Sequence, residues 1–325
     1  MLRLIRNLFF LLGAVAICSA GYAAGDAVTF KRAGDSVEIQ IGGKPFAVYH
    51  FDPQIAKPFM SPLRSAQGTL ITRGFPMVQD IPGEPRDEPH QRALYFAHGL
   101  VNGFDFWGEA AFVKWSDSKI PFGRTVFRKL VEMQDGPGAG SLQAEFDLVG
   151  ADGKIIAAET QAYVFHGDAD SRTVDCEFTL RASHGPVTLG DTKEGTFAIR
   201  LAKELDSPPA HMVNSNGAEG EKGVWGKRAD WVDYDGKVNG EELGVAIFDH
   251  PQNLRHPTYW HARGYGLFAA NPFGIKEFTR DPHQDGSYTL PAGGSLVLRY
   301  RVLIHHGDFK QAEVAQAYQD YSAGK

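Results

Sequence analysis

The sequence predicts an all-β protein, a large antiparallel β-sandwich with long loops and one C-terminal helix. Three observations predict it: apolar and polar residues alternate over many short segments, turn signals separate these segments, and only one segment has a helical pattern. Such a series of strands is typical of two sheets packed face to face. About 300 residues remain after the leader described below, which suits a single domain over residues 25–325.

Eight strands are predicted in the first half of the chain. Gly42-Gly43 marks a tight hairpin between two strands, and turns at 135–138 and 151–154 separate the later ones. Residues 53–62 and 75–88 are rich in proline, glycine or charge and are predicted to be loops. The strands predicted here are 28–30, 37–41, 46–49, 68–72, 111–115, 125–133, 141–149 and 155–166.

The second half continues the pattern with one interruption. Residues 208–230 mix glycine, charge and tryptophan, and we expect a long loop over a sheet. Asp308 is positioned to cap a final helix from 309 to about 321. The strands predicted here are 172–183, 187–189, 196–201, 231–234, 242–248, 265–270, 287–290 and 295–305.

Residues 1–24 have the layout of a secretory signal peptide. Arg3 and Arg6 precede an apolar run that is too short to span a bilayer, and small residues follow it. Cleavage after Ala20 or Ala24 fits this pattern, whereas Cys18 follows a bulky Ile17 and is a poor lipoprotein cysteine. A periplasmic or secreted location is therefore expected.

Charge and cysteine content narrow the possible partners. Without the two leader arginines, 31 basic residues face 39 acidic ones, a net charge of −8. An acidic surface argues against nucleic acid as a partner, and no later stretch is apolar enough for a membrane span. Cys176 would be the only cysteine left, in an alternating segment typical of a buried strand.

Two distant stretches carry most of the candidate chemistry. Residues 86–109 and 249–263 crowd histidines and arginines between apolar residues, and buried polar groups are costly unless partnered. We expect the two stretches to meet in one cleft. The candidate acid–base residues are His90, His98, His256 and His261, because histidine exchanges protons near neutral pH.

Cationic and aromatic residues in and between these stretches are candidate substrate contacts. Arginine can grip a carboxylate or oxyanion, and aromatic rings can pack on apolar sugar faces. The alternative is that each arginine pairs with a neighbouring acid. The predicted substrate-binding residues are Arg92, Asn102, Trp107, Lys222, Arg228, Arg255 and Trp260.

Other chemistries have weaker signals. The sequence has no HExxH or CxxC, so a divalent metal would need ligands from several loops. It also lacks a GxSxG elbow, a phosphate-binding GxxxxGK[ST] loop and a dinucleotide fingerprint. An acid pair for glycoside hydrolysis stays open, with Asp87, Glu109, Glu221 and Asp230 as the acids of interest.

Four segments resemble the DUF6807 family, whose members are often labelled "methane oxygenase PmoA". They are KPFMSPLRSAQGTLITRGFP, HQRALYFAHGLVNGFDFWGE, GEKGVWGKRADWVDY and IFDHPQNLRHPTYWHARGYGLFAANPFG. The resemblance implies a β-rich fold similar to galactose-mutarotase-like sandwiches and a secreted bacterial protein associated with sugar degradation. The family's first motif is often DHPHHR-like, and here Glu88 and Gln91 stand where it has two histidines, so a metal or proton relay there is in doubt.

The favoured hypothesis is a carbohydrate-active hydrolase, lyase or epimerase with a small-molecule or oligosaccharide substrate. The histidines would serve as general acid and base. The alternatives are a glycan-binding protein without catalysis and a metal-dependent oxygenase, as the family label suggests.

Overall fold

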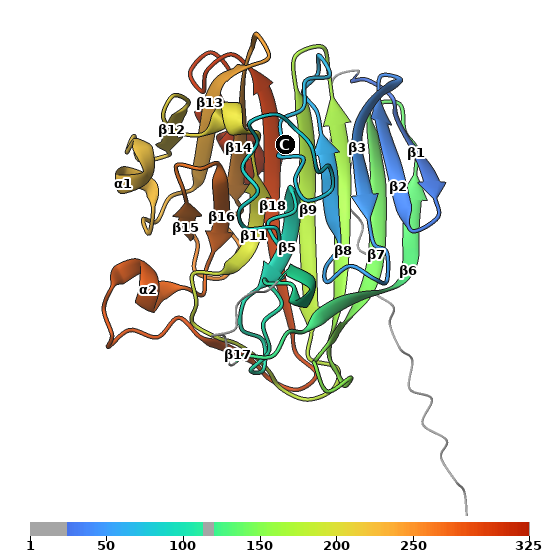
Figure 1. The fold of residues 1–325 in the computed structure, drawn as a ribbon, viewed down its shortest axis with the longest axis vertical. Coiled ribbons are helices and arrows are strands. Elements are labelled where there is room, and N and C mark those ends of the chain that lie inside the picture. The colour runs from blue at the N-terminus through green and yellow to red at the C-terminus, as the bar shows by residue number, and fades with distance from the viewer. Residues whose placement is uncertain (1–24, 113–119, 325) are drawn as a thin grey trace, which may run out of the picture.

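Two antiparallel eight-stranded sheets form the body of the protein in the computed structural model, which describes residues 25–112 and 120–324 (Figure 1). The predicted leader lies outside the described residues. The first sheet has the order β1 (Val28–Ala33), β2 (Ser36–Ile41), β3 (Lys44–His50), β4 (Phe59–Leu63), β5 (Leu94–His98), β11 (Gly195–Arg200), β16 (Leu267–Asn271), β15 (Tyr259–Ala262).

The second sheet packs against the first. It has the order β12 (His211–Asn214), β13 (Trp231–Val238), β14 (Glu241–Asp249), β18 (Ser295–His306), β9 (Arg172–Arg181), β8 (Ile155–Gly167), β7 (Ala139–Val149), β6 (Arg124–Gln134). Phe96 of β5 stacks on Phe178 of β9 with ring centroids 4.1 Å apart, so the core lies between the sheets. The predicted all-β sandwich is confirmed.

The alternation of apolar and polar residues in the sequence accounts for the strands of the second sheet. In β7, Leu142, Ala144, Phe146 and Leu148 are buried and their neighbours are half-buried, which is the pattern of a strand with one face on the core. Cys176 of β9 is buried in the same way, as the sequence predicted.

Three strands of the first sheet lie in segments for which no strand was predicted, one in a predicted loop and two in the polar stretches. β4, β5 and β15 are mostly buried on both faces, so their sequences do not alternate and give little strand signal. The predicted strand at 68–72 forms only isolated bridges at Leu70 and Thr72. Of the one predicted at 111–115, the first two residues belong to a 3-10 turn, Ala110–Phe112, and the rest lies outside the described residues.

The helices and remaining strands are short. The predicted loop at 208–230 contains β12 and α1 (Gly220–Val224), and α2 (Ile275–Thr279) was not predicted. The C-terminal helix α3 is Val314–Ser322, later than predicted, because Asp308 Oδ1 accepts from the amides of Lys310 and Gln311 in a preceding turn. The others are β10 (Val187–Leu189), β17 (Tyr288–Leu290) and a 3-10 turn, Lys203–Leu205.

Candidate functional site

A row of four residues crosses the outer face of the first sheet, the face turned away from the second sheet. Tyr95 of β5 is paired with Ala198 of β11, Ala198 with Ala269 of β16, and Ala269 with His261 of β15. Adjacent strands lie about 4.8 Å apart, so Tyr95 and His261 are separated by about 14 Å across the two alanines. The two polar residues are therefore separated by two small side chains, which are both 0% exposed.

Tyr95 is backed by a tryptophan and a buried ion pair. The rings of Tyr95 and Trp107 are 5.0 Å apart, and the Lys57 ammonium lies 5.0 Å from the Tyr95 ring centroid. Lys57 Nζ donates to the Trp107 carbonyl at 2.6 Å and to Glu109 Oε1 at 3.1 Å. Burial alone would raise the pKa of Glu109, but Lys57 and Arg92 lower it overall. This lysine fixes the position of the aromatic wall.

His90 lies beside this wall among positive charges. Its ring is 6.4 Å from that of Trp107, and its Nδ1 is 3.5 Å from Glu88 Oε2. Burial, together with the charges of Lys57, Arg73 and Arg200, lowers the pKa of His90 to about 3. The imidazole is therefore neutral at physiological pH.

His261 is neutral as well, and its tautomer is set by the backbone. Burial lowers the pKa of His261 to about 4. A carbonyl only accepts, so the 3.0 Å contact between Nδ1 and the Lys193 carbonyl places the proton on Nδ1. The lone pair is then on Nε2, which is the form of histidine that can take up a proton.

The Glu194 carboxylate links the two stretches electrostatically. Burial raises the pKa of Tyr95 and of Glu88, and the charge of Glu194 raises both further. The same carboxylate partly offsets the lowering of the His261 pKa. Glu194 thus lies near Glu88 and Tyr95 of the first stretch and near His261 of the second, so both stretches contribute residues to this face.

Two arginines complete the group. Arg73 and Arg200 are 1% and 2% exposed, and both contact Asp87 Oδ1, at 3.1 and 3.4 Å. The Tyr265 ring lies 4.4 Å from the Arg200 guanidinium carbon. We call the following residues the outer cluster: Lys57, Arg73, Glu88, His90, Tyr95, Trp107, Glu109, Glu194, Arg200, His261 and Tyr265.

Several buried polar atoms of the outer cluster are unpaired. Among the described residues, Tyr95 Oη, Trp107 Nε1 and Arg73 Nε have no hydrogen-bond partner. Native proteins leave few such atoms, because each costs about 1–3 kcal/mol. Unpaired donors on one face of the sheet are suited to a polar ligand.

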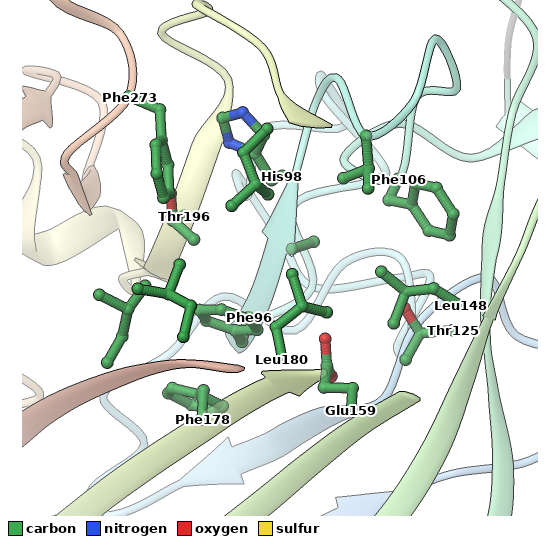
Figure 2. Close-up of a pocket in the computed structure, with 15 residues that line it drawn as sticks. Phe96, His98, Phe106, Thr125, Leu148, Glu159, Phe178, Leu180, Thr196 and Phe273 are labelled. Carbon is green, nitrogen blue, oxygen red and sulfur yellow. The ribbon is translucent and has the colours of Figure 1, made fainter. Parts of the chain in front are cut away.

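His98 lies on the other face of the sheet. It lines a cavity of about 20 Å³ between the sheets together with Thr196 and Glu159 (Figure 2), room for about one water molecule. Its Nε2 donates to the Gly190 carbonyl at 2.7 Å, and burial lowers the pKa of His98 to about 4. His98 therefore does not share a face with His90.

His256 belongs to a third place, next to α3. Its Nδ1 lies 2.8 Å from Oδ2 of the buried Asp249, and its Nε2 lies 3.4 Å from both Asp230 Oδ1 and the Tyr318 hydroxyl. This network joins the 249–258 turn to the C-terminal helix. The structure thus separates His256 from His261, and the predicted roles of all four histidines stay predictions.

Most of the predicted substrate-binding residues hold the backbone or pair with acids. Arg92 forms a two-pronged contact with Glu109 at 2.8 and 2.9 Å, and Asn102 joins two loops by bonds to the Pro186 carbonyl and the Thr188 amide. Arg228 donates to the carbonyls of 255–257, and Arg255 donates to those of Pro272 and Ser287.

The remaining three predicted contacts differ in position. Trp107 lies in the outer cluster. Trp260 is 0% exposed between the sheets and its Nε1 donates to the Ala229 carbonyl, which is the environment of a core residue. Lys222 is exposed on α1.

Sequence reasoning missed several members of the outer cluster. Arg73 and Arg200 follow apolar runs, LIT and TFAI, and an arginine in such a setting is a signal of a buried charge that could have been used. Lys57 lies in a segment that was predicted to be a loop. Nothing in the sequence around Tyr95 and Glu194 marked them as members of a site.

Two further observations concern ligands and membranes. Within residues 25–112 and 120–324, no group of three or more histidine, cysteine or acidic side chains is arranged to hold a metal ion. The helices of the same residues are all too short or too polar to cross a membrane.

The protein is a two-sheet antiparallel sandwich that carries a cluster of ionisable side chains on the outer face of one sheet. The chain belongs to DUF6807, a family of unknown function, whose family model matches residues 36–319. The resemblance read from the sequence is confirmed, while the label "methane oxygenase PmoA" finds no support in the comparisons. No curated protein matches the chain.

Solved structures with a similar chain course include a galactose mutarotase-like protein and α-galactosidases. A galactose mutarotase-like protein from Clostridium acetobutylicum has 11% identity and a TM-score of 0.43, with 87% of this chain and 99% of that chain covered. An α-galactosidase from Lactobacillus brevis has 9% identity and a TM-score of 0.43, with 88% and 40% covered. The GH36 α-galactosidase AgaA from Geobacillus stearothermophilus has 12% identity and a TM-score of 0.40, with 86% and 41% covered.

The chain thus spans about two fifths of the length of these α-galactosidases. Similarity at these identities and scores transfers no activity to this chain.

Proposed function

We propose that the outer cluster is the active site of a carbohydrate-active enzyme that moves a proton on a sugar, as lyases and epimerases do. One observation carries the proposal: His261, whose pKa burial lowers to about 4, lies on the same face of the first sheet as Tyr95 and Trp107, with Ala198 and Ala269 between His261 and Tyr95. Aromatic rings that can pack on a sugar and a neutral imidazole that can accept a proton are the groups that this chemistry needs. The leader-like residues 1–24 support a periplasmic or secreted location.

Different residues of the outer cluster have different roles in the proposed reaction. His261, with its lone pair on Nε2, serves as the general base that removes a proton from carbon. Glu88, whose pKa burial raises, serves as the proton donor. The positive charges of Arg73, Arg200 and Lys57 favour the oxyanion that forms when the proton leaves.

Two other functions give different results in solution. A hydrolase would cleave a glycosidic bond with a pair of carboxylates and without exchange of carbon-bound hydrogen. A glycan-binding protein would bind without product. The raised pKa of Glu88 fits a hydrolase as well, but the neutral imidazole favours proton abstraction.

The test is incubation of the purified protein in D₂O with a panel of mono- and oligosaccharides, followed by NMR. Deuterium in the recovered sugar, an epimer or an unsaturated product supports the proposal. Cleavage without deuterium at carbon would indicate the hydrolase, and saturable binding without any change in the sugar would indicate the binding protein.

The residue test uses two histidines that are chemically alike. His261→Asn is expected to reduce turnover by about 100-fold or more, the usual loss for a general base. His98→Asn is the matched control, since His98 also has a pKa of about 4 and also donates to a carbonyl but lies on the inner face. Turnover is compared per folded molecule, and equal losses in both variants would contradict the proposal.

A further inference from the structure

An open hollow lies at the β15 edge of the first sheet, outside the outer cluster. Its volume is about 440 Å³, within the range of small-molecule sites. Residues of the β10–β11 connection, of α1 and of α2 meet there, and Figure 1 shows α2 beside β15. Its lining residues are Lys193, Trp225, Lys276, Glu277, Arg280 and Pro282.

Two of the three cations that line the hollow are available to a ligand. Lys193 contacts the carboxylates of Glu194 and Glu277, which uses its charge. Lys276 and Arg280 are exposed and, among the described residues, have no carboxylate within ion-pair distance. The hollow therefore offers one ammonium and one guanidinium to an anion.

Aromatic rings form one side of the hollow. Trp225 packs edge-on against Phe278 at 5.7 Å, and the Arg280 guanidinium lies 5.5 Å from the Trp225 ring centroid. Trp225 Nε1 is buried and has no hydrogen-bond partner in the part of the chain that the structure describes. An aromatic ring and two cations together are suited to a sugar with an acidic substituent.

The hollow adjoins the row on the outer face through Lys193 and Phe278. The Lys193 carbonyl accepts the proton of His261 Nδ1, and the Phe278 ring lies 6.4 Å from that of His261. The hollow and His261 are therefore neighbours at this edge of the sheet.

We propose that this hollow is a subsite for a sugar that carries an anionic group, a carboxylate or a sulfate. Lys276 and Arg280 bind the anion, and Trp225 packs on the sugar ring. The inference rests on the proposed function, because it places the acidic sugar next to the one that reacts at His261.

The test measures binding of disaccharides in neutral, uronate and sulfated forms by calorimetry. The double variant Lys276→Gln/Arg280→Asn removes both charges, and asparagine suits the left-handed backbone of Arg280, whose φ is 57°. Affinity for at least one anionic form is expected to fall about tenfold or more, with a weaker salt dependence, while affinity for the neutral form stays the same. The uronate and sulfated forms together show which anion the subsite prefers.

The matched control is Lys44→Gln/Lys227→Gln, which removes two exposed charges that do not line the hollow. The inference is overturned if the two double variants bind alike, if neutral and anionic sugars bind equally, or if none binds. These outcomes are separate from the proposed function, which His261→Asn tests by turnover.

Discussion

The two faces of the first sheet carry the same kind of histidine in different surroundings. His98 inside and His261 outside each donate to a backbone carbonyl, and burial lowers the pKa of both to about 4. Inside, His98 and the carboxyl of Glu159 line a cavity with mostly apolar walls. Outside, the neighbours include charges of both signs, among them Lys193, Glu194 and Arg263. A lowered pKa therefore reports burial, and the surrounding charges distinguish a candidate site from a core.

The largest expected effect concerns the ion pair on the outer face. In Glu109→Gln the buried Lys57 loses its carboxylate partner, and a buried charge left without its partner costs about 3–5 kcal/mol of unfolding free energy. Urea unfolding measures this loss. The control is Lys31→Met, whose pair with Glu38 is exposed and is expected to contribute less than about 1 kcal/mol. Similar losses of unfolding free energy in both variants would show that the buried ion pair stabilises the protein no more than the exposed one.

The next effect concerns the inner face and depends on pH. Burial raises the pKa of Glu159 from 4.5 to about 7, so the folded state keeps the carboxyl protonated where the unfolded state ionises it. Stability is then fully present below about pH 4.5 and falls as pH rises to about 7, by about 3 kcal/mol, since each pKa unit is worth about 1.4 kcal/mol.

Glu159→Gln is expected to remove this fall, since its side chain does not ionise. Unfolding by urea at pH 5 and pH 7.5 measures the slope in wild type, in Glu159→Gln and in the exposed control Glu242→Gln. An unchanged slope in Glu159→Gln would mean that water reaches the carboxyl.

The smallest effect compares two buried hydroxyls. Tyr95 and Tyr300 are 2% and 1% exposed, and neither hydroxyl has a hydrogen-bond partner among the described residues. Removing an unpaired hydroxyl by Tyr→Phe is expected to change the unfolding free energy by less than about 1 kcal/mol at either position. Only Tyr95→Phe should weaken saccharide binding, by about fivefold, because one hydrogen bond is worth about 1 kcal/mol. Equal binding by both variants would remove Tyr95 from the site.

Three long strands of the second sheet could be predicted from the sequence, because apolar and polar residues alternate along them. β7, β8 and β9 bury every second residue, so their sequences alternate. β5 and β15 are almost wholly buried on both faces, and their polar residues were interpreted as a cleft wall without the strands that hold them. The candidate site lies on these strands, so its geometry was the least predictable part.

The two polar stretches show what chain order cannot decide. Both stretches contribute residues to the outer face of the first sheet, Tyr95 from one and His261 from the other, but strand pairing sends His98 to the inner face and the 249–258 turn carries His256 to α3. Arg92, a predicted substrate contact, forms an ion pair with Glu109.

The sequence by itself determined the all-β class and the family, because residue alternation, turn residues and long motifs are local properties. The tertiary structure alone decided that two alanines separate Tyr95 from His261 and that Arg73, Arg200 and Glu194 surround them. That arrangement depends on the register of four strands from three distant parts of the chain, which only their joint packing sets.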